Sequence, residues 1–139
     1  MTLPEDEARA RLVAARVARL ATADAGGRPH LVPVTFDFDG LGSLVIAVDH
    51  KPKRTADLRR LRNIRANPLV SLLADHYEDD WARLWWVRAD GSAAVVEDDA
   101  GRAGPLARLR AKYPQYRETA PAGPVIAVTI TAVSGWSYA

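Results

Sequence analysis

One run of the sequence, residues 30–38, restricts the fold more than any other. Its side chains alternate, so that every second residue from His30 to Phe38 would share one face of a β-strand. These residues are apolar after His30, whereas the intervening positions include Pro33 and Thr35. Because a proline has no N–H to donate to a neighbouring strand, we expect an edge or a bulge at Pro33. The chain must therefore form a sheet in which this strand is not regularly paired along its whole length.

Further short apolar runs, separated by turn residues, predict a β-rich fold. The expected strands cover residues 17–23, 44–49, 69–77 and 81–87, then 92–96 as a continuation or a sixth strand, and 125–133. Helices are expected up to about residue 15, over 54–66, and from 97 to about 113 with a restart at Gly104 and Pro105. Short connections between consecutive strands favour antiparallel pairing. The predicted fold class is mainly β (α+β), a β-barrel of about six to seven antiparallel strands with peripheral helices.

The composition is that of an ordinary globular domain. With 139 residues, of which 48% are hydrophobic and 26% charged, the chain has the size of one domain, which we assign to residues 1–139. The sequence contains no cysteine, which excludes disulfides, thiolate metal sites and a cysteine nucleophile. No window approaches the ~20 apolar residues of a membrane span, and the acidic N-terminal segment does not resemble a secretory signal. We therefore expect a cytoplasmic protein.

Positive charge is concentrated in one segment. Residues 51–65 hold seven of the 19 lysines and arginines against a single acid, although the net charge of the chain is only +2. A local basic cluster in a nearly neutral protein favours a small anionic ligand over a long nucleic-acid footprint. The cluster begins at a strand-to-helix junction, where the free N–H groups of a helix N-terminus also attract anions. The alternative is a solvated basic face on a surface helix.

The candidate phosphate-binding residues are the polar and basic side chains of this junction. They are His50, Lys51, Lys53, Arg54 and Thr55. Lysine and arginine donate charge-assisted hydrogen bonds to phosphate, and a threonine hydroxyl adds a neutral donor. His50 lies next to the cations in sequence and could touch the same ligand.

Tryptophans form a second candidate group. Trp81 and Trp85 are four residues apart and would share one face of a strand, where an indole could stack on a planar ligand. The alternative is packing in the core or at a subunit interface, which we expect for Trp86 and Trp136.

The sequence carries no self-sufficient catalytic group. It contains no G-x-S-x-G nucleophile elbow, no P-loop and no G-x-G-x-x-G turn. Its three histidines, His30, His50 and His76, are not at metal-ligand spacing, so no metal site is expected. This pattern suits a protein whose cofactor supplies the reactive atom while the protein binds and orients it.

Several short segments together carry a family resemblance over nearly the whole chain. They are residues 18–22, 27–30 with 33–36, 51–68, 75–77 leading to Trp81, 84–88 with Gly91, 112–116 and 135–136. In this order and spacing they resemble the pyridoxamine 5′-phosphate oxidase-like, FMN-binding split-barrel superfamily. The sequence is most similar to its actinobacterial branch of F420-dependent (deazaflavin-dependent) oxidoreductases.

The resemblance implies a fold, a cofactor and a site. It implies a split β-barrel that dimerises and holds its cofactor, coenzyme F420, in a groove between the two subunits. Ring contacts are then expected from Pro33, Val34 and Thr35, with Trp81 near the ring from either subunit. The cofactor's phosphate is expected at the basic junction described above. The implied activity is hydride transfer between the reduced deazaflavin and a small conjugated organic acceptor.

Two departures and two alternatives accompany the resemblance. The substrate-phosphate motifs and longer C-terminal part of pyridoxamine phosphate oxidases proper are absent, which argues against pyridoxal phosphate synthesis. Arg54 stands where related members have a lysine, so the main phosphate ligand among Lys51, Lys53 and Arg54 stays open. The alternatives are an FMN-dependent oxidoreductase of the same fold and a non-catalytic flavin- or haem-binding module. No nucleic-acid or membrane partner is expected.

Overall fold

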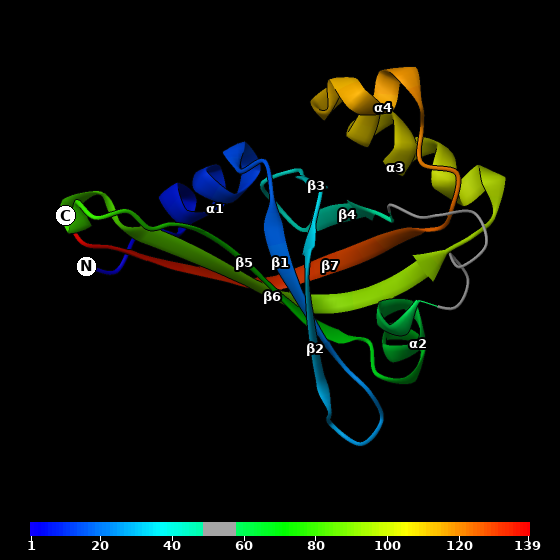
Figure 1. The fold of residues 1–139 in the computed structure, drawn as a ribbon, viewed down its shortest axis with the longest axis horizontal. Coiled ribbons are helices and arrows are strands. Elements are labelled where there is room, and N and C mark those ends of the chain that lie inside the picture. The colour runs from blue at the N-terminus through cyan, green and yellow to red at the C-terminus, as the bar shows by residue number, and fades with distance from the viewer. Residues whose placement is uncertain (49–57) are drawn as a thin grey trace.

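Seven strands form one antiparallel sheet in the computed structural model, which describes residues 1–48 and 58–139 (Figure 1). They are β1 (Ala18–Ala23), β2 (Pro29–Val34), β3 (Phe36–Phe38), β4 (Ser43–Ala47), β5 (Leu69–His76), β6 (Trp85–Val96) and β7 (Val125–Ser137). Their order across the sheet is β2-β1-β5-β6-β7-β4-β3. The prediction of a mainly β, antiparallel fold with peripheral helices is confirmed.

The two edges of this sheet are consecutive pieces of one chain segment. β2 pairs with β1 up to Val34, which lies opposite Ala18, and β3 pairs with β4 from Phe36, which lies opposite Ile46. Only Thr35 separates the two strands. The chain thus passes from one edge of the sheet to the other, which curls the sheet into a split barrel and leaves no regular pairing at the crossing.

The alternation of buried and exposed side chains predicted for residues 30–38 continues although the pairing partner changes from β1 to β4. Val34, Phe36 and Phe38 are buried in the main core, whereas Pro33 lies exposed on edge strand β2. Phe36 is fully buried, a placement that stabilises a fold by roughly 2–3 kcal/mol per large apolar side chain. The edge expected at Pro33 is confirmed.

Helices α1 (Glu5–Ala14) and α2 (Arg59–Ala66) seal the main core from two sides. α1 contributes Leu12, and α2 contributes Leu61 and Ile64, as the apolar stripe of the basic segment predicts. The predicted start of that helix, at residue 54, lies outside the described residues. In the described parts of the chain, no helix combines the length and the apolar character needed to cross a membrane.

The other two helices build a second, smaller core. Helices α3 (Asp99–Lys112) and α4 (Pro114–Glu118) lie together at the top of the view in Figure 1, away from α2. Leu109, Tyr113 and Tyr116 pack against Val45 and neighbouring residues of β4 and β7. The restart predicted at Gly104 and Pro105 is wrong, because α3 runs without interruption through both residues.

Arg108 fastens α3 to the β3–β4 hairpin. Its Nε donates to Asp37 Oδ2 at 2.9 Å and its Nη1 donates to Ser43 Oγ at 2.8 Å. Its Nη2 donates to the Ser43 carbonyl at 2.9 Å and lies 3.2 Å from the Asp37 carbonyl. This one side chain therefore sets the position of the helix relative to the strand crossing.

The strand prediction at Trp81 needs correction. Residues 81–83 form a short 3-10 helix, η2 (Trp81–Arg83), because the Asp80 carboxylate accepts from the Ala82 N–H at 3.1 Å and caps it. The strand therefore begins at Trp85, so Trp81 and Trp85 do not share a strand face. For residues 92–96, the first of the two alternatives is confirmed, since they continue the strand that begins at Trp85.

The pairing of β6 with β7 contains a bulge at Asp90 and Gly91. Asp90 lies opposite Ala132 and Gly91 opposite Ile130, which leaves Thr131 as an extra residue on β7. Its hydroxyl donates to the Asp90 carbonyl at 3.1 Å. A Cβ at residue 91 would lie 2.3 Å from the Thr129 carbonyl oxygen, so glycine allows the two strands to approach here.

Gly91→Ala should lower the free energy of unfolding by about 1–3 kcal/mol, because the added methyl group meets rigid backbone. Gly104→Ala is the matched control. Its Cβ would meet nothing within 4 Å, and alanine should stabilise the helix by about 0.5–1 kcal/mol. Urea denaturation monitored by tryptophan fluorescence measures both. Equal stability of Gly91→Ala and wild type would refute this account of the bulge.

Candidate functional site

Two tyrosines bind the strand crossing: Tyr113 contacts the backbone of Phe36, and Tyr116 contacts the side chain of Thr35. The Tyr113 hydroxyl accepts a hydrogen bond from the Phe36 N–H at 3.1 Å. It donates to the Arg16 carbonyl at 2.8 Å and lies 3.0 Å from the Phe36 carbonyl. The Tyr116 hydroxyl and Thr35 Oγ1 are 2.6 Å apart. The C-terminal ends of α3 and α4 are thereby attached to the crossing.

A pocket of about 450 Å³ opens at this point, and we call it the junction pocket. It is lined by Arg16, Thr35, Tyr113, Gln115 and Tyr116. The lining therefore comes from the α1–β1 connection, the strand crossing and the two C-terminal helices. Aromatic walls with a few hydroxyl, amide and guanidinium groups are typical of a site for a small planar ligand.

A reciprocal set of hydrogen bonds holds the cationic side of the junction pocket. Arg16 Nη2 donates to the Lys112 carbonyl at 2.9 Å, and Lys112 Nζ donates to the Ala15 carbonyl at 2.7 Å. Lys112 Nζ also lies 4.0 Å from the centroid of the Phe36 ring. Burial lowers the pKa of Lys112 to about 8, with Asp37 opposing the shift and Arg16 adding to it. Burial raises the pKa of Tyr113, which keeps its hydroxyl protonated.

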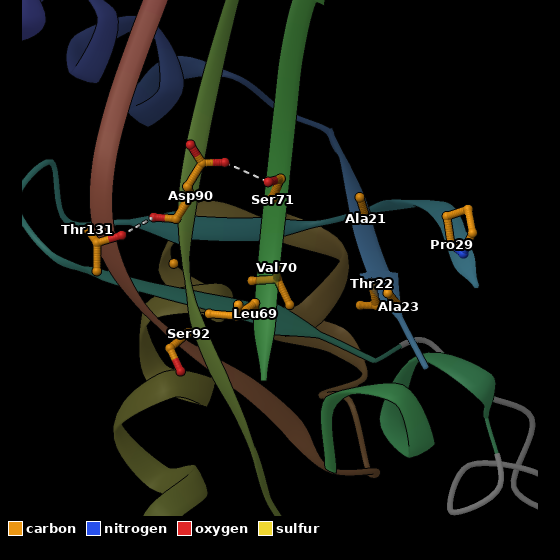
Figure 2. A pocket seen from close by; sticks show the side chains of 11 residues that line it. Ala21, Thr22, Ala23, Pro29, Leu69, Val70, Ser71, Asp90, Ser92 and Thr131 are labelled. Atoms are coloured by element: carbon orange, nitrogen blue, oxygen red, sulfur yellow. Dashed lines mark hydrogen bonds between the residues drawn. The ribbon is translucent and has the colours of Figure 1, made fainter. Parts of the chain in front are cut away.

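A second hollow, of about 480 Å³, lies on the outer face of the sheet across β1, β5, β6 and β7 (Figure 2). At its floor Ser71 Oγ donates to Asp90 Oδ1 at 2.6 Å. Beside it stand Leu31 and Leu69, which are 67% and 69% exposed. We call the hollow and these two leucines the outer apolar face. Large exposed aliphatic side chains gathered on one face are typical of a contact surface.

A third hollow, of about 400 Å³, lies between the β1–β2 turn and α2. Its lining includes Arg59, Arg62 and the buried Asn63, whose Nδ2 donates to Thr22 Oγ1 at 3.0 Å. Burial, followed by the charges of Arg59 and Arg60, lowers the pKa of nearby His30. The arginine charges favour an anion here, whereas burial by itself disfavours a charge of either sign.

The predicted ring-contact residues differ in whether their side chains can reach a ligand. Thr35 lines the junction pocket, and Pro33 is exposed beside it on β2, whereas the Val34 side chain is in the main core. Val34 could therefore meet a ligand only through its backbone. Trp81, 65% exposed on η2, lies at the end of the sheet where β6 meets the C-terminus of β7.

The predicted phosphate-binding residues His50, Lys51, Lys53, Arg54 and Thr55 lie outside the described residues. The Ala47 N–H donates to the Thr35 carbonyl at 3.2 Å, so the last residue of β4 adjoins the strand crossing.

Sequence reasoning did not find Arg16, Tyr113, Gln115 and Tyr116 as site residues. The segment 112–116 contributes to the family resemblance, but its contact with Thr35 spans 81 positions of the chain for Tyr116. The only available signal was the dense run Lys-Tyr-Pro-Gln-Tyr itself, which follows a helix and combines a cation with two hydroxyl-bearing rings.

Comparison with known proteins identifies the fold. Residues 4–137 match the model of a family described as pyridoxamine 5′-phosphate oxidase. The structure is similar to an FAD-binding protein from Mesorhizobium loti (24% identity, TM-score 0.74, covering 97% of this chain and 95% of that chain). It is also similar to the heme storage protein HutZ from Vibrio cholerae (20% identity, TM-score 0.70, covering 94% of this chain and 89% of that chain). A third similar structure is the FAD binding protein from Mycobacterium smegmatis (21% identity, TM-score 0.64, covering 98% of this chain and 97% of that chain). No curated protein matches the sequence.

Tyr113→Phe should lower the free energy of unfolding by about 1–3 kcal/mol, because it leaves the buried Phe36 N–H without its acceptor. Tyr138→Phe, at an exposed tyrosine, should change it by less than about 0.5 kcal/mol. Chemical denaturation of the two variants in parallel provides the measurement. If both variants match wild type, the tyrosine does not secure the crossing.

Proposed function

This chain belongs to the pyridoxamine 5′-phosphate oxidase family, and from that premise we propose that it is a flavin-type oxidoreductase that binds coenzyme F420. The proposed reaction is hydride transfer between the reduced deazaflavin and a small conjugated organic acceptor. FMN is the alternative cofactor, and its phosphate would use the same basic segment.

One observation supports the proposal: the Ala47 N–H donates to the Thr35 carbonyl, so the end of β4 adjoins the expected ring contact at Thr35. Beyond Ala47 the chain continues into the basic residues Lys51 to Thr55, and at Thr35 it presents the expected ring contacts. A phosphate held by the basic segment would therefore leave the attached ring near Pro33 and Thr35. Cations in one segment and an apolar strand in the other suit an amphipathic cofactor.

The junction pocket is the proposed acceptor site, because it shares Thr35 with the expected ring position. The bound cofactor would supply the hydride chemistry. The protein's own part would be to hold the acceptor between Tyr113 and Tyr116, orient it with Arg16 and shield it from water with α3 and α4. Positioning of this kind raises the effective concentration of reactants without any catalytic acid or base from the chain.

We further propose a homodimer whose outer apolar faces meet, with the cofactor groove at their margin. The outer face of β2, β1 and β5 carries the exposed side chains of Leu31 and Leu69, whereas α2, which contacts β1, packs its apolar side chains into the main core. In such a dimer, Trp81 on η2 would reach the cofactor of the partner subunit. This arrangement accounts for a large exposed indole at a sheet end distant from its own junction pocket.

A non-catalytic heme-binding role is the second candidate, favoured by the structural likeness to the heme storage protein HutZ. Of the histidines in the described residues, His76 is the more exposed candidate ligand, and its Nε2 contacts the Glu78 carboxylate. The absorbance spectrum of the purified protein separates this role from flavin or deazaflavin binding.

Lys53→Ala/Arg54→Ala should weaken F420 binding by about tenfold or more, because it removes charge-assisted contacts to the phosphate. Arg65→Ala is the control, because Arg65 belongs to the same basic cluster but pairs with Glu97 at 2.5 Å. This variant should bind F420 with the affinity of the wild type. Fluorescence titration with F420, and in parallel with FMN and hemin, measures each affinity. Tight FMN or hemin binding without F420 binding would replace the proposal with one of its alternatives.

Leu69→Arg should convert the dimer to a monomer, because it places a charge in the centre of the proposed apolar contact. Leu41→Arg, at a residue 76% exposed on the β3–β4 turn, is the control and should stay dimeric. Light scattering after size exclusion gives the masses. A monomeric wild type, or a dimeric Leu69→Arg, would exclude this interface.

A further inference from the structure

Two cations lie against one wall of the junction pocket. The Arg16 guanidinium carbon is 4.9 Å from the centroid of the Tyr113 ring, and Lys112 Nζ is 5.4 Å from the same centroid. Tyr113 and Arg16 both line the pocket, whereas Lys112 stands behind them. The two cations are fixed in place by hydrogen bonds to each other's backbone region, from Arg16 to the Lys112 carbonyl and from Lys112 to the Ala15 carbonyl.

The acid nearest to these cations is already engaged. Asp37, on β3, is the one carboxylate whose charge acts on Lys112 among the described residues, and its Oδ2 accepts from Arg108 Nε on α3 at 2.9 Å. The remaining groups that face Lys112 are Arg16, which is a cation, and Tyr113, whose hydroxyl stays neutral. The described surroundings of the pocket therefore have an excess of positive charge, with no acid left to neutralise both Arg16 and Lys112.

We propose that Lys112 is a specificity-determining charge of the junction pocket, which selects anionic over neutral planar acceptors. The inference rests on the proposed function, in which this pocket holds the acceptor. It narrows the acceptor class to planar, conjugated carboxylates or similar anions. Lys112 acts from behind the pocket wall, so it is a positioning charge rather than a catalytic residue.

The coupling to pH follows from the burial of Lys112. In the free protein its pKa is lowered to about 8 from 10.5, mainly by burial, so the amine loses its proton as the pH rises through this value. A bound anion favours the protonated form and raises the pKa of Lys112 in the complex. Below about pH 8 the amine is charged before and after binding, whereas above it the anion binds more weakly and with proton uptake. Arg16 stays charged throughout and contributes no such pH dependence.

Cinnamate and its neutral isostere cinnamamide are suitable probes. Isothermal titration of the purified full-length protein, with and without F420, should show that cinnamate binds about fivefold more tightly than cinnamamide near neutral pH. This preference should decline between about pH 7.5 and about pH 9.5. At the alkaline end, titrations in two buffers of different ionisation enthalpy should reveal proton uptake with cinnamate and none with cinnamamide.

Three variants isolate the role of Lys112. Lys112→Met should abolish most of the charge preference near neutral pH and all of its decline with pH. Lys112→Arg should keep the preference and extend it unchanged to alkaline pH, because a guanidinium does not lose its proton there. Arg16→Gln should weaken cinnamate binding but leave the decline with pH in place. Circular dichroism shows whether each variant is folded. If Lys112→Met does not fold, the pH profile of Lys112→Arg still tests the proposal.

Equal affinity for the two probes, no measurable cinnamate binding, or the same pH profile in wild type and Lys112→Arg would each overturn the proposal. Failure of the proposed cofactor role is distinguishable, because it would appear as absent F420 binding in the separate fluorescence titration. The preference for cinnamate can be measured in that case as well.

Discussion

The structure depends on one strand that serves both edges of the sheet. β2 completes its pairing with β1 at Val34, and β3 begins its pairing with β4 at Phe36, where the backbone N–H binds a tyrosine hydroxyl instead of a strand. A buried N–H or carbonyl without a partner costs about 1–3 kcal/mol. The hydroxyl of Tyr113 meets this requirement by binding the Phe36 N–H and the Arg16 carbonyl together. The C-terminal helices are therefore part of the barrel's closure rather than an appendage.

The same solution creates the candidate site. Tyr113, which follows α3, and Tyr116 of α4 bind the crossing, and their rings form walls beside Thr35. The hydrogen bonds between the α1–β1 connection and the end of α3 bring Arg16 and Lys112 to one side of this pocket. Closure of the barrel and formation of a cationic, aromatic pocket are thus consequences of one set of contacts. The bulge at Thr131 and the close approach at Gly91 act separately, since they shape the outer face rather than the junction pocket.

Local patterns predicted most of the elements, and they failed where neighbouring residues compete with the pattern. The alternation from His30 to Phe38 identified the core face correctly, because side-chain burial follows the strand period whichever strand is the partner. The strand predicted at Trp81 was wrong because the Asp80 side chain caps a 3-10 helix there. The strand preference of bulky residues does not prevail where such a cap favours a helical turn. The sequence left open whether residues 92–96 continue the strand, because the close approach that Gly91 permits involves Thr129, 38 positions away.

From the sequence alone came the antiparallel β-rich class, the buried faces of the strands and of α2, and the concentration of positive charge in residues 51–65. These follow from periodicity and composition, which are local properties of the chain. Tertiary structure alone decided that Thr35 is the crossing between two sheet edges and that it meets Tyr113, Tyr116 and Arg16 in one pocket. The physical reason is that hydrogen bonds at an unpaired crossing can be satisfied by any suitably placed hydroxyl. No local pattern states which distant residue will supply it.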